Sequence, residues 1–289
     1  MDILILEDSI NLTKFDREKI KDFSIFYSPI SLIEKNLNKN NISLIVANSL
    51  PLHIQQLLKE RNIKTISPKE FMEKYLEKID IEPEYLNKLS LSPYNKFQYL
   101  FKRFIDFAIS IPLLVLSSPL IAYSIYRIKK ESPDGPVLFT QNRVGENGKI
   151  FKCYKFRSMR TDSEYFSEYT QENDPRIFPW GEFMRKSRID ELPQILNVIK
   201  GDMHLIGPRA EWEKLVKNYE KEIPFYHKRH LVKPGITGWA QVNYPYGSNL
   251  EDTKQKLMYD LFYIKNWSIK LELKTIFKTI EVMLKKKGR

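Results

Sequence analysis

The chain has 289 residues, of which 42% are hydrophobic and 29% charged, a composition that excludes both an intrinsically disordered chain and a polytopic membrane protein. Its formal net charge is +11, but residues 1–95 carry 13 Lys and Arg against 14 Asp and Glu, whereas residues 96–289 carry 34 against 22. The basic character therefore belongs to the second part, which indicates an anionic partner there, such as lipid headgroups, phosphates or nucleic acid.

Short apolar runs alternate with helical patterns in residues 1–82. Residues 2–6, 24–27 and 43–47 are predicted strands, and residues near 13–21, 51–61 and 68–79 are predicted helices. This alternation predicts a small α/β accessory domain with a parallel sheet, of the Rossmann or flavodoxin type. It has no glycine-rich phosphate-binding turn, so we expect docking, regulation or oligomerisation. Residues 83–98, polar with Pro83 and Pro93, are expected to form a linker.

An uncharged run of 20 residues, 107–126, is long enough to cross the hydrocarbon core of a bilayer as a straight helix. Pro119 follows Ser118 near its middle, and a bend is expected there because proline removes a backbone hydrogen bond. Basic residues, which favour the cytoplasmic side, flank both ends. A re-entrant helix hairpin over about residues 104–128 keeps both ends on one side. A single straight span and a buried core helix are the alternatives.

A basic amphipathic pattern follows Trp267. Lysines alternate there with apolar residues at helical spacing, namely Ile269, Leu271, Leu273, Ile276, Phe277, Ile280 and Leu284 among Lys270, Lys274, Lys278 and Lys285, Lys286 and Lys287. The pattern predicts an amphipathic helix in the membrane interface. The alternative is a helix packed on the core with lysines in solvent.

The densest group of candidate catalytic residues is an acidic pair, Asp190 and Glu191, among three basic residues. Apolar spacing predicts a helix that starts near Asp190, with Pro193 tolerated in its first turn. Adjacent side chains on a helix diverge by about 100°, so the two carboxylates can divide between a substrate and a metal ion. The pattern suits a diphosphate bridged by Mg²⁺, with simple helix capping as the alternative.

Cationic segments lie on both sides of this pair in the sequence. A hairpin-like turn at residues 142–148 leads into residues 151–159, where alternation places Lys155 and Arg157 on one face of a strand. Downstream, Gly207-Pro208-Arg209 predicts a tight turn that presents an arginine, whose planar fork suits phosphate oxygens.

Residues 232–242 predict a glycine-containing loop around a tryptophan. Within this loop, Gly235 and Gly238 precede Trp239 and Gln241. Glycines let a backbone approach a ligand closely, and an indole ring can stack on a base. The loop is therefore a candidate nucleotide-binding segment.

From about Tyr99 to the C-terminus, the sequence resembles the bacterial sugar transferases that act as monotopic phosphoglycosyl transferases. The matching stretches, in order, are KRFIDFAISIPLLVLSSPL, RVGENGKIFKCYKFRSMR, DPRI, RKSRIDELPQILNVIKGDMHLIGPR and VKPGITGWAQVN. The resemblance implies a mixed α+β catalytic domain at residues 99–289, attached to the membrane by a re-entrant helix with a break matching Ser118-Pro119. The chain departs from the family's G-P-R-P turn at Ala210. It also has a compact segment where long members carry membrane spans.

The resemblance further implies a reaction. A sugar-1-phosphate would pass from a UDP-sugar to polyprenyl (undecaprenyl) phosphate with release of UMP, as the first membrane step of exopolysaccharide or O-antigen assembly. Asp190 would form a phosphosugar-aspartyl intermediate, Glu191 would hold Mg²⁺, and Lys155, Arg157 and Arg209 would bind phosphate. The expected place is the cytoplasmic face of the bacterial inner membrane.

Two other interpretations of the sequence remain open. One is a membrane-associated glycosyltransferase that releases UDP, and the other is a basic membrane-binding module without catalysis. No nucleic-acid-binding motif is present, so nucleic acid is not an expected partner. The sequence leaves open whether the chain forms a homodimer.

Overall fold

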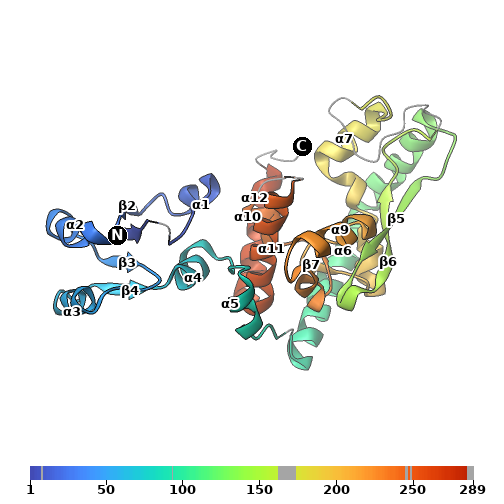
Figure 1. The fold of residues 1–289 in the computed structure, drawn as a ribbon. Helices are drawn as coiled ribbons and strands as arrows, with labels where there is room; N and C mark the ends of the chain where they lie inside the picture. The colour runs from blue at the N-terminus through green and yellow to red at the C-terminus, as the bar shows by residue number, and fades with distance from the viewer. Residues whose placement is uncertain (8, 93, 162–173, 245–246, 248, 285–289) are drawn as a thin grey trace. The chain divides into compact units, whose positions relative to one another are not determined.

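The computed structural model describes residues 1–289 apart from 8, 93, 162–173, 245–246, 248 and 285–289 (Figure 1). The basic residues Lys285, Lys286 and Lys287, predicted to extend the last helix, lie outside the described residues. The chain divides into two compact units, Met1–Leu86 and Asn87–Arg289.

The first unit is built on a parallel four-stranded sheet with the strand order β2-β1-β3-β4. The strands are β1 (Asp2–Leu6), β2 (Ser24–Ser28), β3 (Leu44–Val46) and β4 (Lys64–Ile66). The helices are α1 (Lys14–Lys19), η1 (Ile30–Leu32), α2 (Ile33–Lys39), α3 (Leu52–Glu60), α4 (Pro68–Phe71) and η2 (Met72–Leu76). The α/β class with a parallel sheet is confirmed, and α2 and β4 are additional to the predicted elements.

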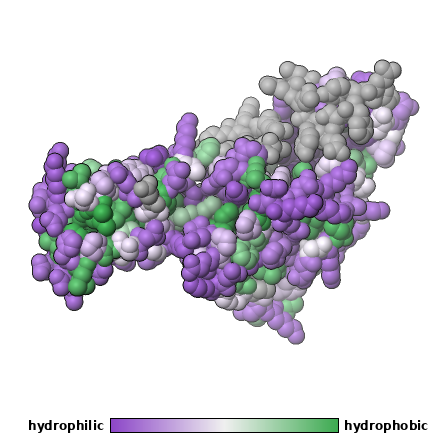
Figure 2. Space-filling view, viewed as in Figure 1, coloured by the Kyte–Doolittle hydropathy of each residue, from purple (hydrophilic) through white to green (hydrophobic). Residues whose placement is uncertain are grey.

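The core of this unit comes from its central strands. Ile3, Leu4 and Ile5 of β1 have no exposed surface, nor do Ile45 and Val46 of β3. Consecutive side chains of these strands point to opposite faces of the sheet and are buried on both, which explains why the strands read as continuous apolar runs. Apolar residues also remain on the surface of the unit, where hydrophobic and hydrophilic residues are interspersed (Figure 2).

The second unit begins with a 36-residue helix, α6 (Lys96–Glu131), which a capping box between Asn95 and Gln98 opens. Residues 83–98, the predicted linker, contain α5 (Pro83–Lys88) and the first residues of α6. Judged by length and composition, α6 is the one helix in the described chain that could cross a bilayer. Helix α6 continues without interruption through Pro112 and Pro119.

The rest of this unit mixes short strands and helices. An antiparallel hairpin, β5 (Leu138–Val144) and β6 (Ile150–Phe156), turns through η3 (Glu146–Gly148), and β7 (His204–Ile206) pairs in parallel with β8 (Gly235–Thr237). The helices are α7 (Pro179–Ser187), η4 (Ile189–Glu191), α8 (Gln194–Lys200), α9 (Glu213–Glu222), η5 (Tyr226–Leu231), α10 (Trp239–Asn243), α11 (Leu250–Lys265) and α12 (Ile269–Leu284). Helices α10, α11 and α12 lie together (Figure 1). The predicted mixed architecture is confirmed.

Buried polar contacts fix the N-terminal half of α6 to this unit. Lys102 donates to Glu272 Oε1 of α12 at 2.7 Å and to the Tyr263 hydroxyl at 3.0 Å. One turn later, Asp106 contacts His204 Nδ1 at 2.5 Å and accepts from the Leu205 amide at 3.0 Å. These groups are almost fully buried. Separating this half of α6 from the unit would leave buried charges without their partners, which is strongly destabilising.

The C-terminal end of α6 packs against the same unit through different elements. Ile128 is fully buried in an apolar cluster with Phe156, Phe178 and Met184. Glu131, the last residue of α6, accepts a hydrogen bond from the Trp180 amide at 2.7 Å. Both ends of α6 are therefore attached to one globular body.

The middle of α6 is exposed and apolar. Val115 is 65% exposed and Leu116 79%. Only 11% of its most apolar 18-residue window is buried. This exposure contradicts the alternative of a buried core helix.

Candidate functional site

The acidic pair lies in a short 3₁₀ turn, η4, between α7 and α8. Arg188 precedes the turn with φ of 60°, a left-handed conformation that ends α7 and redirects the chain. The helix predicted to start near Asp190 starts instead at Gln194, because Pro193 is accommodated only at a helix start. The prediction of two carboxylates in the first turn of an α-helix is therefore wrong, although both carboxylates are present at one site.

Glu191 is a buried carboxylate held by cations from three segments. Its Oε1 accepts from Lys155 Nζ of β6 at 3.0 Å and from Arg209 Nη2 at 3.2 Å, and Arg188 Nη1 lies 3.9 Å away. Burial alone would raise the pKa of Glu191, but Arg209 and Lys155 hold this pKa far below its usual range. Glu191 therefore stays ionised.

Asp190 differs from its neighbour in its contacts. The residue is 8% exposed, and its Oδ1 is buried without a hydrogen-bond partner in the described part of the chain. Burial raises the pKa of Asp190, with a contribution from Glu191, although Lys155 opposes the shift. A carboxylate oxygen with free lone pairs is available to attack an electrophile or to bind a cation.

Arg209 reaches Glu191 from the turn after β7, and the turn is held from two sides. Arg229 Nη2 donates to the Arg209 carbonyl at 2.9 Å, and Arg143 Nη1 donates to the Ala210 carbonyl at 2.6 Å. Arg229 is itself buried and paired with Asp260. Two arginines thus brace the turn in which Ala210 replaces the family's proline.

The five residues predicted to form the catalytic and phosphate-binding site do not all meet there. Lys155 and Arg209 join the acidic pair, as their contacts with Glu191 show. Arg157 follows the last residue of β6 and donates its five N–H groups to oxygens of Ser132, Gly135, Pro136 and Met159. A guanidinium has five such groups, so this arrangement argues against Arg157 as a phosphate ligand and makes it a support of the loop after α6.

The glycines of the loop at residues 232–242 serve close packing between backbones. A Cβ on Gly235 would lie 2.1 Å from the Gly207 amide nitrogen, and one on Gly238 would lie 2.1 Å from the Gly207 carbonyl oxygen. Gln241 donates to the Ile236 carbonyl at 3.3 Å. The loop is therefore bound to the turn that carries Arg209, rather than left open for a ligand backbone.

Trp239 is 1% exposed. Its ring stacks on Phe262 at 6.2 Å between centroids, and the ammonium groups of Lys274 and Lys278 lie about its faces at 5.1 and 5.0 Å. No exposed ring face remains for a base. The prediction of base stacking on Trp239 is not supported by this packing.

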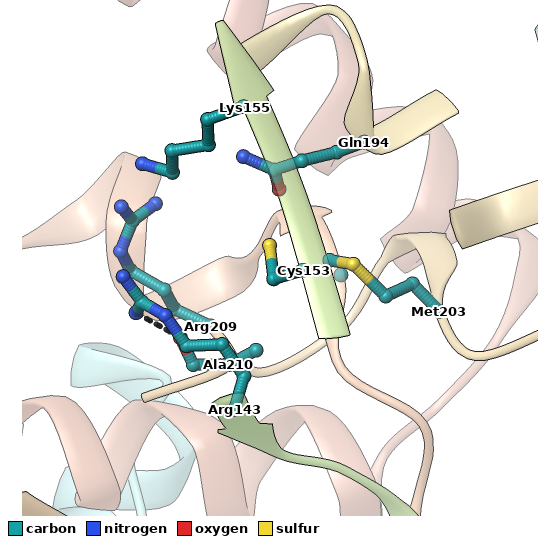
Figure 3. Close-up of a pocket in the computed structure, with 8 residues that line it drawn as sticks. Arg143, Cys153, Lys155, Gln194, Met203, Arg209 and Ala210 are labelled. Atoms are coloured by element: carbon teal, nitrogen blue, oxygen red, sulfur yellow. Dashed lines mark hydrogen bonds between the residues drawn. The ribbon is translucent and has the colours of Figure 1, made fainter. Parts of the chain in front are cut away.

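Arg143 begins the matching stretch RVGENGKIFKCYKFRSMR, but the sequence analysis gave it no role at the site. It lies near the end of β5 and lines a small pocket together with Lys155 and Arg209 (Figure 3). Gln194, the first residue of α8, lines the same pocket. Nothing in the alternation of β5 distinguishes Arg143 from an ordinary exposed strand residue.

The acidic pair offers oxygen donors that suit Mg²⁺. In the described ranges, no group of three or more His, Cys, Asp or Glu side chains is placed to hold a metal ion. Mg²⁺ is usually bound by one or two carboxylates together with substrate phosphates and water. Asp190 and Glu191 fit that donor set, because Asp190 Oδ1 is buried without a partner among the described residues.

These observations define a class of protein. A buried acidic pair ringed by cations, in a unit with a long exposed apolar helix, suits phosphorylated substrates and is compatible with a membrane-associated protein. The model of the family described as "Bacterial sugar transferase" matches residues 97–286. The chain belongs to this family.

Three relatives illustrate the match. UDP-N-acetylgalactosamine-undecaprenyl-phosphate N-acetylgalactosaminephosphotransferase of Aeromonas hydrophila is 44% identical over 218 residues, which cover 75% of this chain and 51% of the relative. UDP-glucose:undecaprenyl-phosphate glucose-1-phosphate transferase of Escherichia coli is 39% identical over 193 residues, 65% of this chain and 41% of the relative. The chain therefore spans about half the length of these two proteins. Exopolysaccharide production protein PSS of Rhizobium leguminosarum is 41% identical over 186 residues, 62% of this chain and 92% of the relative.

Proposed function

We propose that the protein is a phosphoglycosyl transferase that moves a sugar-1-phosphate from a UDP-sugar to undecaprenyl phosphate and releases UMP. The names of the Aeromonas and Escherichia relatives support this substrate class, and the Rhizobium relative supports a role in polysaccharide assembly. The observation that carries the proposal is the contrast within the acidic pair. Glu191 is fixed by Lys155 and Arg209, while Asp190 Oδ1 is buried and unpaired within the described chain.

The proposed first half-reaction uses Asp190 as the nucleophile. A carboxylate oxygen of Asp190 forms a bond to the sugar-linked phosphorus, and the bond from that phosphorus to the bridging oxygen breaks, so that the electron pair leaves with UMP. In the second half-reaction, an oxygen of undecaprenyl phosphate attacks the same phosphorus and releases the aspartate. A covalent intermediate lets a soluble and a lipid substrate react in turn.

Cations of the site stabilise the charge that moves in these steps. Lys155 and Arg209 lie beside the acidic pair, where they can bind phosphoryl oxygens as they develop charge. Glu191 would hold Mg²⁺, which would neutralise charge on the diphosphate and on the leaving phosphate.

The attachment of α6 supports a re-entrant, monotopic arrangement. A straight helix of 36 residues would be roughly 54 Å long at ~1.5 Å per residue, yet both of its ends contact one globular unit. Ser118 Oγ donates to the Val115 carbonyl at 2.7 Å, which is the acceptor that Pro119, lacking an N–H, leaves free. Satisfying that carbonyl matters in a bilayer, where no water replaces the lost bond.

The last helix supports the same arrangement. The exposed apolar residues of α12 follow one face, namely Ile269, Leu273, Phe277, Ile280, Met283 and Leu284. A helix of this kind, with lysines beside its apolar face, binds the membrane interface. We therefore place α12 in the cytoplasmic interface, next to the membrane-embedded part of α6.

An assay of the released nucleotide tests the proposed reaction. The full chain is offered a panel of UDP-sugars with undecaprenyl phosphate and Mg²⁺, and UMP and UDP are measured separately. We expect UMP, no UMP from Asp190→Asn, and an altered Mg²⁺ requirement in Glu191→Gln. Glu182→Gln, which changes an exposed carboxylate of α7, is the matched control with normal turnover. Release of UDP would establish a glycosyltransferase instead, and vesicle binding without either nucleotide would establish a non-catalytic module.

A second experiment tests the topology. Cysteines introduced at Lys88 and at Lys149 are labelled from either side of sealed vesicles, in a chain whose buried Cys153 is replaced by alanine. Both positions are expected to react from the same side. Reaction from opposite sides would contradict the re-entrant arrangement.

A further inference from the structure

Arg143 is a largely buried cation without a close carboxylate partner in the described chain. Its side chain is 13% exposed, and the distance from its Nη1 to Glu211 Oε2 is 3.9 Å, at the outer limit of an ion pair. Its Nη1 binds the Ala210 carbonyl, whereas its Nε is buried without a partner in the described residues. A buried charge is costly unless it is paired and hydrogen-bonded. The Nε–H of Arg143 therefore remains able to donate to an anionic ligand.

The neighbours of Arg143 are other cations. The guanidinium groups of Arg143 and Arg209 lie next to each other, and Lys155 lies beyond Arg209 (Figure 3). Burial lowers the pKa of Arg143, and the positive charge of Arg209 lowers it further. Three positive charges thus line one pocket, and the nearby carboxylate Glu191 is bound to Lys155 and Arg209. An anion is needed to balance the row.

The pocket itself limits what can enter between these groups. Its volume is about 10 Å³, enough for about one water-sized group. A single phosphoryl oxygen fits such a space, whereas a ring or a sugar does not. Arginine is suited to this task because its planar fork binds phosphate oxygens with more than one N–H.

Lys155, Arg209 and Arg143 form a row that leads away from the acidic pair. Lys155 and Arg209 contact Glu191, the neighbour of Asp190, and Arg143 lies on the far side of Arg209 from Lys155. If the sugar-linked phosphorus lies at Asp190, the other phosphorus of a diphosphate lies one step along this row. That second phosphoryl group is the one that carries the nucleoside.

We propose that Arg143, together with Arg209, binds the nucleoside-bearing phosphoryl group of the diphosphate substrate and holds the departing nucleoside monophosphate. This inference rests on the proposed function and adds a residue to the donor site. The acceptor lipid phosphate meets the sugar-linked phosphorus at Asp190 after UMP has left. Arg143 is therefore assigned to the first half-reaction alone.

The test compares Arg143→Gln and Arg143→Lys with the wild-type chain and with Lys152→Gln. Lys152 is an exposed cation on the opposite face of β6, so its variant is a control for the loss of a positive charge. UMP binding is measured directly by titration calorimetry, and initial rates give the KM for the UDP-sugar and for undecaprenyl phosphate. Thermal unfolding is recorded for every variant.

Loss of a hydrogen bond to a charged group is expected to weaken UMP binding by roughly tenfold or more in Arg143→Gln. We expect the KM for the UDP-sugar to rise in parallel, the KM for undecaprenyl phosphate to stay within a factor of about two, and Arg143→Lys to recover part of the affinity because it keeps the charge. Lys152→Gln should match the wild type.

Two results would overturn the inference. Unchanged UMP affinity in Arg143→Gln would remove Arg143 from the donor site. Equal losses for UMP and for undecaprenyl phosphate, with a lower unfolding temperature in both Arg143 variants, would make Arg143 a support of the Ala210 turn only. Failure of the proposed function is distinct, because the wild-type chain itself would then release no UMP.

Discussion

Replacing Asp260 by asparagine tests how Arg209 is held in place. Asp260 and Arg229 are 2% and 5% exposed, and Arg229 binds the Asp260 carboxylate at 2.8 Å and the Arg209 carbonyl at 2.9 Å. Removing one partner of a buried ion pair costs about 3–5 kcal/mol, because the remaining charge is left buried. Asparagine keeps one acceptor, so we expect the lower end, about 3 kcal/mol. For a domain of this size, that corresponds to a fall in Tm of roughly 6–12 °C.

The same substitution is expected to reduce turnover. When the carbonyl of Arg209 loses its fixed donor, the guanidinium becomes displaced from the acidic pair, and a misplacement of about 1 Å can cost up to a hundredfold in rate. UMP release is measured well below the Tm of the variant, so that unfolding does not contribute. Glu213→Gln, which weakens a surface pair with the exposed Lys217 on α9, is the control and should leave Tm and turnover nearly unchanged. A Tm within a degree of the wild type, or normal turnover in a destabilised Asp260→Asn, would refute the reasoning.

Three further predictions concern buried charges. Burial raises the pKa of Asp190, so the acid limb of single-turnover UMP release should lie above the usual aspartate range, and Lys155→Gln should move it higher by removing a cation that favours the ionised form. Burial also lowers the pKa of His204 to about 4. As the pH falls, the unfolded chain therefore protonates this histidine before the folded chain does. The free energy of unfolding that His204 contributes above pH ~6.5 should decrease by up to about 3 kcal/mol toward pH ~4. Urea unfolding should show a flatter pH dependence in His204→Gln than in the wild type. Glu272→Gln leaves Lys102 buried without its carboxylate, so Tm should drop and protease should cleave the released α12 faster, which unchanged digestion would contradict.

The sequence predicts the fold where the local pattern matches the burial. In the first unit, β1 and β3 are buried on both sides and read as apolar runs, so their strand character is evident from the residues alone. Strand β4 has only three residues and lies at the edge of the sheet, with Lys64 and Thr65 exposed. Its position depends on pairing with β3, a tertiary contact that no local pattern encodes.

The site shows the same division between local and tertiary information. The motifs identify Asp190 and Glu191 and the cations Lys155 and Arg209, because these residue types at these spacings suit phosphate chemistry. They do not identify the left-handed Arg188 that shifts the helix start, since a positive φ in a residue with a side chain depends on its surroundings. The pattern around Arg157 also does not predict its contacts. Strand β6 ends one residue before Arg157, and the guanidinium donates to carbonyl groups of the loop after α6.

The acidic pair and the long apolar helix α6 are parts of one packed structure. Ile189 and Leu192, on either side of the pair, pack in the cluster that contains Ile128 of α6. Helix α8, which follows the acidic pair, contacts Arg103 of α6. Arg103 Nη1 donates to the Val198 carbonyl at 2.9 Å. The C-terminal end of α6 therefore packs on both sides of the acidic pair, and its N-terminal half holds α8, the helix that follows the pair. In the proposed membrane arrangement, the depth of α6 in the bilayer would set the height of Asp190 above the lipid phosphates. A change in α6 that leaves every proposed catalytic side chain in place should then still alter the rate of transfer to the proposed lipid acceptor.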